Sequence, residues 1–280
     1  MIKKKLFVLL GCLALCFPRA DAESHHLPEP SQHVEAIGLA MSLTDVSLNT
    51  DTDSGLTLKC TLEGSLEKGA KADIETVVLD DTVLLNYYTP CFPDLSDGSP
   101  VQFTMGFDAE ILRYIQKERL NKIRLFITVT KDSRKVSDSW FEFDLPVELE
   151  SIVSPLPDVP EPKAVFEQDG LYFELLGMQV DRGLLILDMR VENHNSMEKK
   201  VQFMDGAING VPLSCDSLAY FIGGNHTLPE GSQSRFQYGF FLYEYGEDGQ
   251  RTRLLPYDLS EIQSVELFLV TEMEVAFAIP

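Results

Sequence analysis

Positive charge is scarce in this chain of 280 residues, in which 44 Asp and Glu residues outnumber 23 Lys and Arg residues. The formal net charge is −21. A polyanion of this size is repelled by nucleic-acid backbones and by anionic lipid surfaces, so we expect no nucleic-acid partner. The charge instead favours cationic peptides, basic proteins or divalent metals as partners.

Long apolar runs are also lacking. The run from Leu6 to Leu15 is too short to cross a bilayer, which takes about 20 apolar residues, and no later stretch is long enough. Lys3-Lys4-Lys5 precedes this run and Ala20-Asp21-Ala22 follows it, in the order of a secretory signal peptide and its cleavage site. The sequence therefore predicts a secreted or cell-envelope protein with no integral membrane segment in the mature chain.

An alternative for this segment is lipid attachment, because Leu9-Leu10-Gly11-Cys12 resembles the attachment box of bacterial lipoproteins. Only six residues separate Cys12 from the lysines, which favours ordinary cleavage after Ala22 over an anchor at Cys12. Cleavage removes four basic residues and one acidic residue, so the formal charge changes from −21 to −24.

Cysteine is rare as well, with five residues, of which two lie in the signal peptide. The remaining three, Cys60, Cys91 and Cys215, cannot all pair within one chain. Cys60 lies in the alternating run Leu56 to Leu62, and Met189 takes its place in a later, similar run, which predicts a buried thiol. A Cys60 to Cys91 disulfide is the alternative in an oxidising compartment.

The common catalytic motifs are absent from the sequence: it contains no Gly-x-Ser-x-Gly, no His-Glu-x-x-His, no Cys-x-x-Cys and no phosphate-binding glycine loop. We therefore expect neither an enzyme nor a cofactor. The many carboxylates keep an accessory hydrolase of cell-wall or host glycans open as an alternative. The only tryptophan, Trp140, opens an alternating strand, where packing is a simpler role than a sugar platform.

Several sequence patterns of the chain occur twice. The pattern that begins at Gly38-Leu39 returns 132 residues later at Gly170-Leu171. Phe103-x-Met105-Gly106-Phe107 returns at residues 236–240, and the run at 123–127 returns at 265–269, in the same order. Three ordered matches indicate a duplicated domain.

Both copies alternate apolar and polar residues over runs of four to eight, as half-buried β-strands do. Asn209-Gly210 is a strong hairpin signal, and Asp80-Asp81 holds the corresponding place in the first copy. We predict an all-β fold of two tandem immunoglobulin-like β-sandwiches. Each also has one segment of helical spacing, 108–115 and 255–262, where a short helix or helical turn is expected.

The predicted boundaries follow composition. Residues 1–22 are the signal peptide, and 23–33 form a disordered lead without apolar periodicity. Residues 34–150 form the first immunoglobulin-like domain, 151–164 a proline-rich linker, and 165–280 the second such domain. Four prolines between Pro155 and Pro162 favour a stiff, extended spacer that holds the two domains apart.

Two segments contain candidate metal ligands. After cleavage, His25 is the third residue from a free amine, an arrangement that chelates copper or nickel, and His26 could assist. Asp51 and Asp53 alternate as in the start of a calcium loop, but the glycine arrives one place late and Cys60 holds the position of the last ligand. An acidic turn is the simpler interpretation of that segment.

The Asn209-Gly210 hairpin, Leu228-Pro229-Glu230-Gly231 before Phe236-x-Tyr238, and the run Leu259 to Leu267 resemble uncharacterised immunoglobulin-like domains. Those domains are repeated in exported proteins and lipoproteins of Gram-positive bacteria. The resemblance covers both copies, is clearer in the second, and implies the fold and an envelope location without catalytic residues. We therefore expect a non-catalytic binding or structural protein with an unknown protein or glycan ligand. The negative net charge of the chain favours a cationic ligand.

Overall fold

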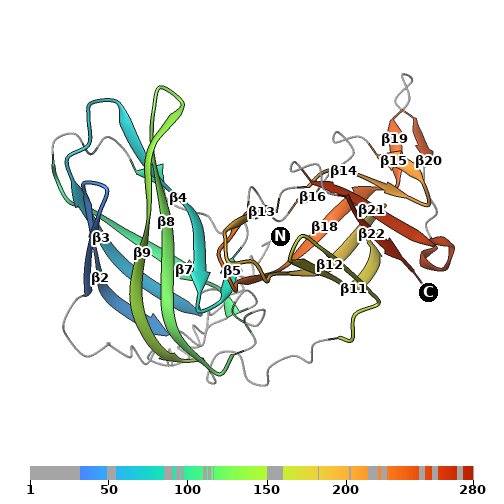
Figure 1. Ribbon diagram of the computed structural model, residues 1–280, viewed down its shortest axis with the longest axis horizontal. Helices are drawn as coiled ribbons and strands as arrows, with labels where there is room; N and C mark the ends of the chain where they lie inside the picture. Colours follow the sequence, from blue (N-terminus) through green and yellow to red (C-terminus); the bar gives the residue numbers. More distant parts are fainter. Residues whose placement is uncertain are drawn as a thin grey trace, which may run out of the picture.

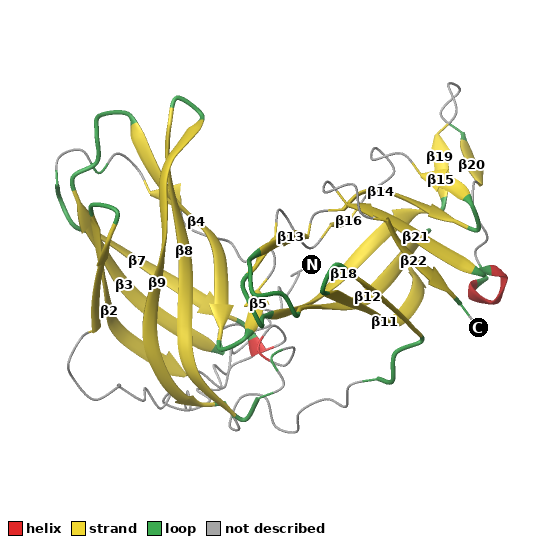
Figure 2. Cartoon of the chain, in the orientation of Figure 1, coloured by secondary structure: helices red, strands yellow, loops and turns green. Residues whose placement is uncertain are grey.

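In the part of the chain that it describes, the computed structural model is mostly β-strand, which confirms the predicted all-β class (Figures 1 and 2). The described residues are 32–48, 55–84, 91–92, 95, 98–109, 112, 115, 117–149, 160–181, 183–201, 203–213, 220–221, 226–245, 250–253, 258–269 and 274–279.

The N-terminal half pairs two sheets around one apolar core. The first has the order β1-β2-β3-β7 and the second the order β5-β4-β8-β9, with a short strand β6 beside β4. Their bounds are β1 Gln32–Ala36, β2 Leu39–Leu48, β3 Leu56–Gly64, β4 Ala70–Leu79, β5 Thr82–Leu84, β6 Cys91–Phe92, β7 Val101–Phe107, β8 Arg119–Lys131 and β9 Arg134–Glu148. Alternating strand residues turn inward, so the two sheets close on each other as a β-sandwich does.

The C-terminal half repeats this plan. A sheet of order β10-β11-β12-β18 shares a core with a sheet of order β15-β14-β21-β22. Their bounds are β10 Ala164–Gln168, β11 Leu171–Asp181, β12 Leu184–Asn193, β14 Phe203–Ile208, β15 Val211–Leu213, β18 Gln233–Phe241, β21 Ser264–Leu269 and β22 Glu274–Ala278. The shorter strands are β13 Lys199–Val201, β16 Tyr220–Phe221, β17 His226–Leu228, β19 Tyr243–Tyr245 and β20 Arg251–Arg253.

Details of the two halves correspond as closely as the strand order does. A bulge shifts the register of β2 between Leu43 and Asp45, and one shifts β11 between Leu175 and Gly177, which is the same place at the offset of 132 residues. The bulges and the common strand order show which strand of one half corresponds to which strand of the other.

The same registers place Cys60 and Met189 in matching positions. Cys60 pairs with Leu43, and Met189 pairs with Leu175. Cys60 is 2% exposed and is a free thiol, so the predicted buried thiol is confirmed and the alternative disulfide to Cys91 is not formed.

The two halves touch, and the predicted separation by a stiff linker is wrong. β5 and β18 pair in parallel through Thr82 and Gln233, which joins one sheet of each half into a single ten-stranded sheet (Figure 1). Val78 and Val83 of the N-terminal half are buried in the core of the C-terminal half. A composition rich in proline fixes the stiffness of a linker, but it carries no information about the surfaces that the linker brings together.

The predicted boundaries differ from the strands by a few residues. β1 begins at Gln32 and so includes two residues assigned to the lead, and β10 begins at Ala164, the last residue assigned to the linker. Leu259–Glu261 forms a three-residue 3-10 turn, η2, whose N-cap Asp258 accepts a hydrogen bond from the backbone of Ser260. The corresponding segment of the first half lies partly outside the described residues.

Val78→Asp tests the contact between the halves. We expect it to separate them, because a carboxylate at this fully buried position would lie unpaired against the C-terminal core. Small-angle scattering should show a larger maximum dimension while circular dichroism keeps its β-sheet signal. Val136→Asp is the matched control, since Val136 is 59% exposed. An unchanged maximum dimension for the folded Val78 variant would contradict the arrangement.

Candidate functional site

The four metal candidates predicted from the sequence, His25, His26, Asp51 and Asp53, lie outside the described residues. Within the part of the chain that the structure describes, no group of three or more His, Cys, Asp or Glu side chains is arranged to hold a metal ion. The described residues also include no helix that is long and apolar enough to span a membrane.

Trp140 is a packing residue. Its ring lies 5.0 Å from the ring of Phe126, and the guanidinium of Arg124 lies over it at 5.5 Å. The indole is half-buried and packs against the core of the C-terminal half. The structure thus agrees with the packing role and gives the single tryptophan a place beside the junction of the halves.

A groove of about 520 Å³ opens over the turn between β1 and β2. In the register of the sheet, Ala40 of β2 stands between Glu35 of β1 and Glu63 of β3. Neighbouring strands are about 4.8 Å apart, so the two carboxylates flank a floor made by one methyl group. Residues 36–39 of the turn, together with Gly64 and Gly98, complete the lining of the groove.

Both glutamates of the groove are exposed. The Glu35 carboxylate lies 3.2 Å from Nε2 of His33, whose Nδ1 is 2.9 Å from the Ser42 hydroxyl. The described side chains that line the groove are aliphatic or carboxylate, so they offer acceptors and apolar surface but neither an N–H donor nor a positive charge. The groove is chemically suited to a cation.

The C-terminal half has a tyrosine where this groove has its alanine. Tyr172 stands between Glu167 and Glu192 in the register, as Ala40 stands between its two glutamates. Its ring stacks on the imidazole of His194 at 5.9 Å, with an angle of 11° between the planes. Desolvation, followed by the neighbouring Glu174 carboxylate, raises the pKa of Tyr172. The C-terminal half thus has an aromatic ring at the position where the first half has a methyl group.

A second difference between the two halves concerns the position of Asn193. Asn193, which is fully buried, donates from Nδ2 to the carbonyls of Leu228 at 2.8 Å and Pro229 at 3.1 Å. Its backbone carbonyl also accepts from Gly231. These bonds tie the loop before β18 to the end of β12.

Gly64 takes the place of this asparagine in the first half, since it pairs with Leu39 as Asn193 pairs with Leu171. Its φ is +151°, and a Cβ there would lie 2.6 Å from the carbonyl oxygen of Gly38. No side chain fits, so this position cannot tie the loop as Asn193 does. Gly98 instead donates to Leu95 within its own loop.

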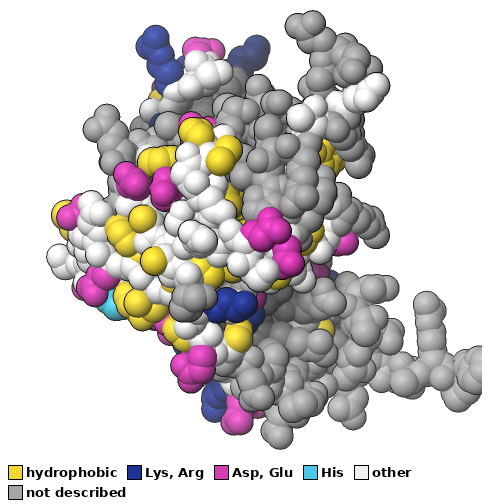
Figure 3. Space-filling view, turned by 90° about the vertical axis from the view of Figure 1, so that its right-hand side faces the viewer, with side chains coloured by type: hydrophobic (Ala, Val, Ile, Leu, Met, Phe, Trp, Pro, Cys, Tyr) yellow, Lys and Arg dark blue, Asp and Glu magenta, His cyan; other side chains and the backbone are white. Residues whose placement is uncertain are grey.

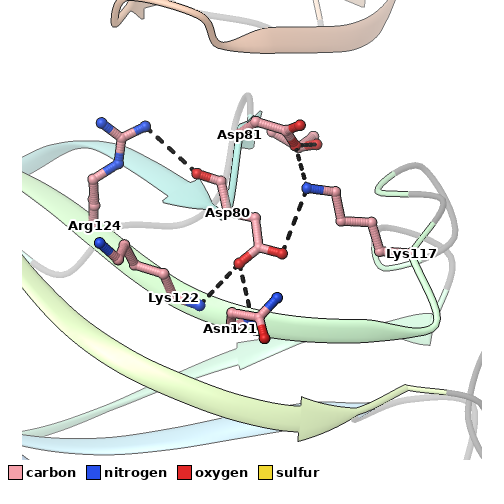
Figure 4. A network of polar contacts seen from close by, with 7 residues as sticks. Asp80, Asp81, Lys117, Asn121, Lys122 and Arg124 are labelled. Atoms are coloured by element: carbon pink, nitrogen blue, oxygen red, sulfur yellow. Dashed lines mark hydrogen bonds and ion pairs between the residues drawn. The ribbon is translucent and has the colours of Figure 1, made fainter.

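The second arrangement of note is the hairpin at the junction of the halves (Figure 4). Asp80 has a φ of +54°, and its Oδ1 accepts from the backbone N–H groups of Asn121 and Lys122, both at 2.9 Å. Lys117 reaches both acids of the turn, with Nζ 3.5 Å from Asp80 and 2.9 Å from Asp81. The turn is thereby fixed to β8 from two sides.

This hairpin also carries the contact between the halves. The backbone carbonyl of Asp81 accepts from the N–H of Gln233 at 2.8 Å, and the Ser234 hydroxyl donates to the carbonyl of Val83 at 2.9 Å. Burial raises the pKa of the Asp81 carboxyl, but the hydrogen bond and charge of Lys117 outweigh it and lower the pKa overall. The folded state therefore favours the ionised form of the Asp81 carboxyl.

Asn209 repeats the device in the C-terminal half. Its φ is +52°, and its Oδ1 accepts from the backbone of Gln263 at 2.7 Å and Ser264 at 3.2 Å. Asp80-Asp81 and Asn209-Gly210 thus form the turns of corresponding hairpins, as the sequence predicts. What sequence reasoning missed is the role of the first hairpin at the junction, and the exchanges of Ala40 for Tyr172 and Gly64 for Asn193. Aligning the two halves of the sequence with each other places these residues at corresponding positions, and this was the signal that could have revealed both exchanges.

Acidic side chains are scattered over the face shown in Figure 3 and do not gather in one place. Among the described residues, the negative charge is thus spread over that face. A comparison of the chain with protein-family models gives no match, and neither does a comparison with curated proteins.

Asp80→Ala and Asp80→Asn separate the two parts of the junction turn. Alanine removes the acceptor of two backbone N–H groups, and should lower the free energy of unfolding by about 2–3 kcal/mol. Asparagine keeps the acceptor, as Asn209 does, and loses only the ion pair with Lys117, which is worth less than about 1 kcal/mol. Urea denaturation followed by fluorescence measures both. Equal losses would show that the charge, and not the acceptor, holds the turn.

The Cys60 thiol should be inert in the folded chain. Burial raises its pKa from 9.0 to about 12. A raised pKa means that the thiol favours folding below pH 9 and that this contribution is lost as the pH rises toward 12, because the unfolded chain ionises first. With the other cysteines replaced by serine, alkylation by iodoacetamide at pH 8 should proceed only at the rate of unfolding. Rapid labelling in native buffer would contradict this.

Proposed function

We propose that this chain is an exported, non-catalytic binding or structural protein of the cell envelope, built of two tandem immunoglobulin-like domains. The export and envelope parts rest on the signal-peptide pattern of residues 1–22. The domain assignment rests on the strand order that the two halves share. The binding role rests on the groove beside Ala40.

The shared strand order supports the immunoglobulin-like assignment. In that fold, strands A, B and E form one sheet and strands C, F and G the other. β2, β3 and β7 pair in the order A-B-E, and β4, β8 and β9 pair in the order C-F-G, with β5 as an added strand beside C. In the C-terminal half, β11, β12 and β18 face β14, β21 and β22 in the same order.

One observation carries the binding role: a groove of about 520 Å³ lies beside Ala40, between two glutamates. The C-terminal half keeps the flanking glutamates but has the larger Tyr172 at this position. Pockets of this size are typical of ligand sites. A scaffold duplicated with its turns and bulges intact but with different surfaces is well suited to separate binding tasks.

Glycan hydrolysis is the second candidate, because the groove carries two carboxylates on strands that flank β2. A glycosidase needs one carboxylic acid in desolvated surroundings as the proton donor. The side chain of Glu35 is 76% exposed, and Glu63 is also exposed, so this arrangement ranks below binding. Metal capture through His25 and His26 stays a prediction from the sequence.

Capture from surface extracts and glycan arrays tests the binding role, with the chain from Glu23 onward as bait and calcium either present or chelated. We expect saturable capture that Ala40→Tyr weakens, since the larger ring would occupy the groove. The matched control is Ser47→Tyr, on the same outer face of β2 but outside the lining of the groove. Cleavage of arrayed glycans would favour the hydrolase, and no capture in any condition would contradict a binding role.

A further inference from the structure

We propose that the groove beside Ala40 binds the side chain of a lysine or arginine from a basic peptide. This inference rests on the proposed binding role and names the chemistry of the ligand. It depends on three independent features of the described residues: what the lining offers, what the C-terminal half puts in the same place, and how much room is left.

The lining offers the complement of a basic side chain. Glu35 and Glu63 stand on either side of Ala40, and the backbone carbonyl of Gly38 lies beside the bare Cα of Gly64. Ammonium and guanidinium groups have only donors, and they form their strongest hydrogen bonds with carboxylates. The aliphatic floor suits the methylene stem that both side chains carry.

The C-terminal half shows that a larger side chain is accommodated at the same register position. There Tyr172 lies between Glu167 and Glu192 and stacks on His194. Tyrosine joins an apolar body to a polar end, and arginine likewise joins an apolar stem to a polar end. An arginine from a partner adds the positive charge that the glutamates favour.

The size of the groove limits what enters. A volume of about 520 Å³ lies in the lower part of the range for small-ligand pockets, about 300–1,000 Å³. It accommodates one or two side chains, and the rest of a peptide would lie across the exposed outer face of β1 and β2. A net charge of −21 favours the approach of such a peptide without selecting where it binds.

The test uses a fluorescein-labelled peptide of six residues that alternates glycine and arginine, with an alternating glycine and glutamate peptide as the negative probe. Fluorescence polarisation with the full chain should show saturable, one-site binding of the arginine peptide alone. Unlabelled peptide with lysine in place of arginine should compete. The measurement is made at 150 mM salt, where general attraction to a polyanion is largely screened beyond about 8 Å.

Two variants change the groove in different ways. Ala40→Tyr fills it, and the pair Glu35→Gln with Glu63→Gln keeps its shape and removes its charge. Each should weaken binding of the arginine peptide by about tenfold or more, as expected when a charge-assisted hydrogen bond is lost. The unfolding temperature of each variant is measured to show that the fold is intact.

The matched control is Glu167→Gln with Glu192→Gln, which changes the total charge equally at the corresponding positions of the C-terminal half. It should change the affinity less than about twofold. Equal weakening by both pairs, or unaltered binding by the groove variants, would overturn the proposal. Absence of peptide binding alongside successful capture from extracts would refute the groove ligand while leaving the binding role, whereas failure of both would count against the role itself.

Discussion

The arrangement of this molecule depends on the hairpin between β4 and β5. Its turn residue Asp80 adopts a positive φ and is held by two backbone N–H groups of β8, so the strand that follows leaves the first sandwich in one fixed direction. That strand meets β18 and joins the sheets of the two halves. Residues on the same hairpin serve both cores: Val77 and Leu79 face the first, and Val78 and Val83 the second. Since these side chains alternate along the strand, one short hairpin fixes both halves.

Asp80 and Asn209 show what the two halves have in common. Each places a side-chain oxygen against two backbone N–H groups, at a turn whose positive φ few residues adopt at low cost. The oxygen is the shared requirement. The charge is not, because the second copy uses an amide, while the first copy adds Lys117 beside its carboxylates. The added ion pair occurs where the turn also supports the neighbouring half.

Surfaces have diverged where the turns and bulges have not. Gly64 and Asn193 occupy one position, and the asparagine closes the loop that the glycine leaves unconnected at that point. Ala40 and Tyr172 occupy another, with a methyl group in one half and an aromatic ring in the other. Both positions line the groove in the first half. The two copies therefore share a scaffold and present different surfaces, which is the arrangement expected of a protein whose domains have separate tasks.

The sequence by itself determined the β-strands, the corresponding hairpins and the buried Cys60, because alternation, turn residues and an internal repeat are local patterns. The sequence also shows that Ala40 corresponds to Tyr172, but two aligned residues do not reveal that a groove lies beside one of them. Only the tertiary structure decided the junction. Val78 alternates with Val77 and Leu79 and so points out of its own sandwich, and its burial depends on a surface in the other half of the chain. Contacts of that kind follow from shape and packing between folded units, which no local pattern records.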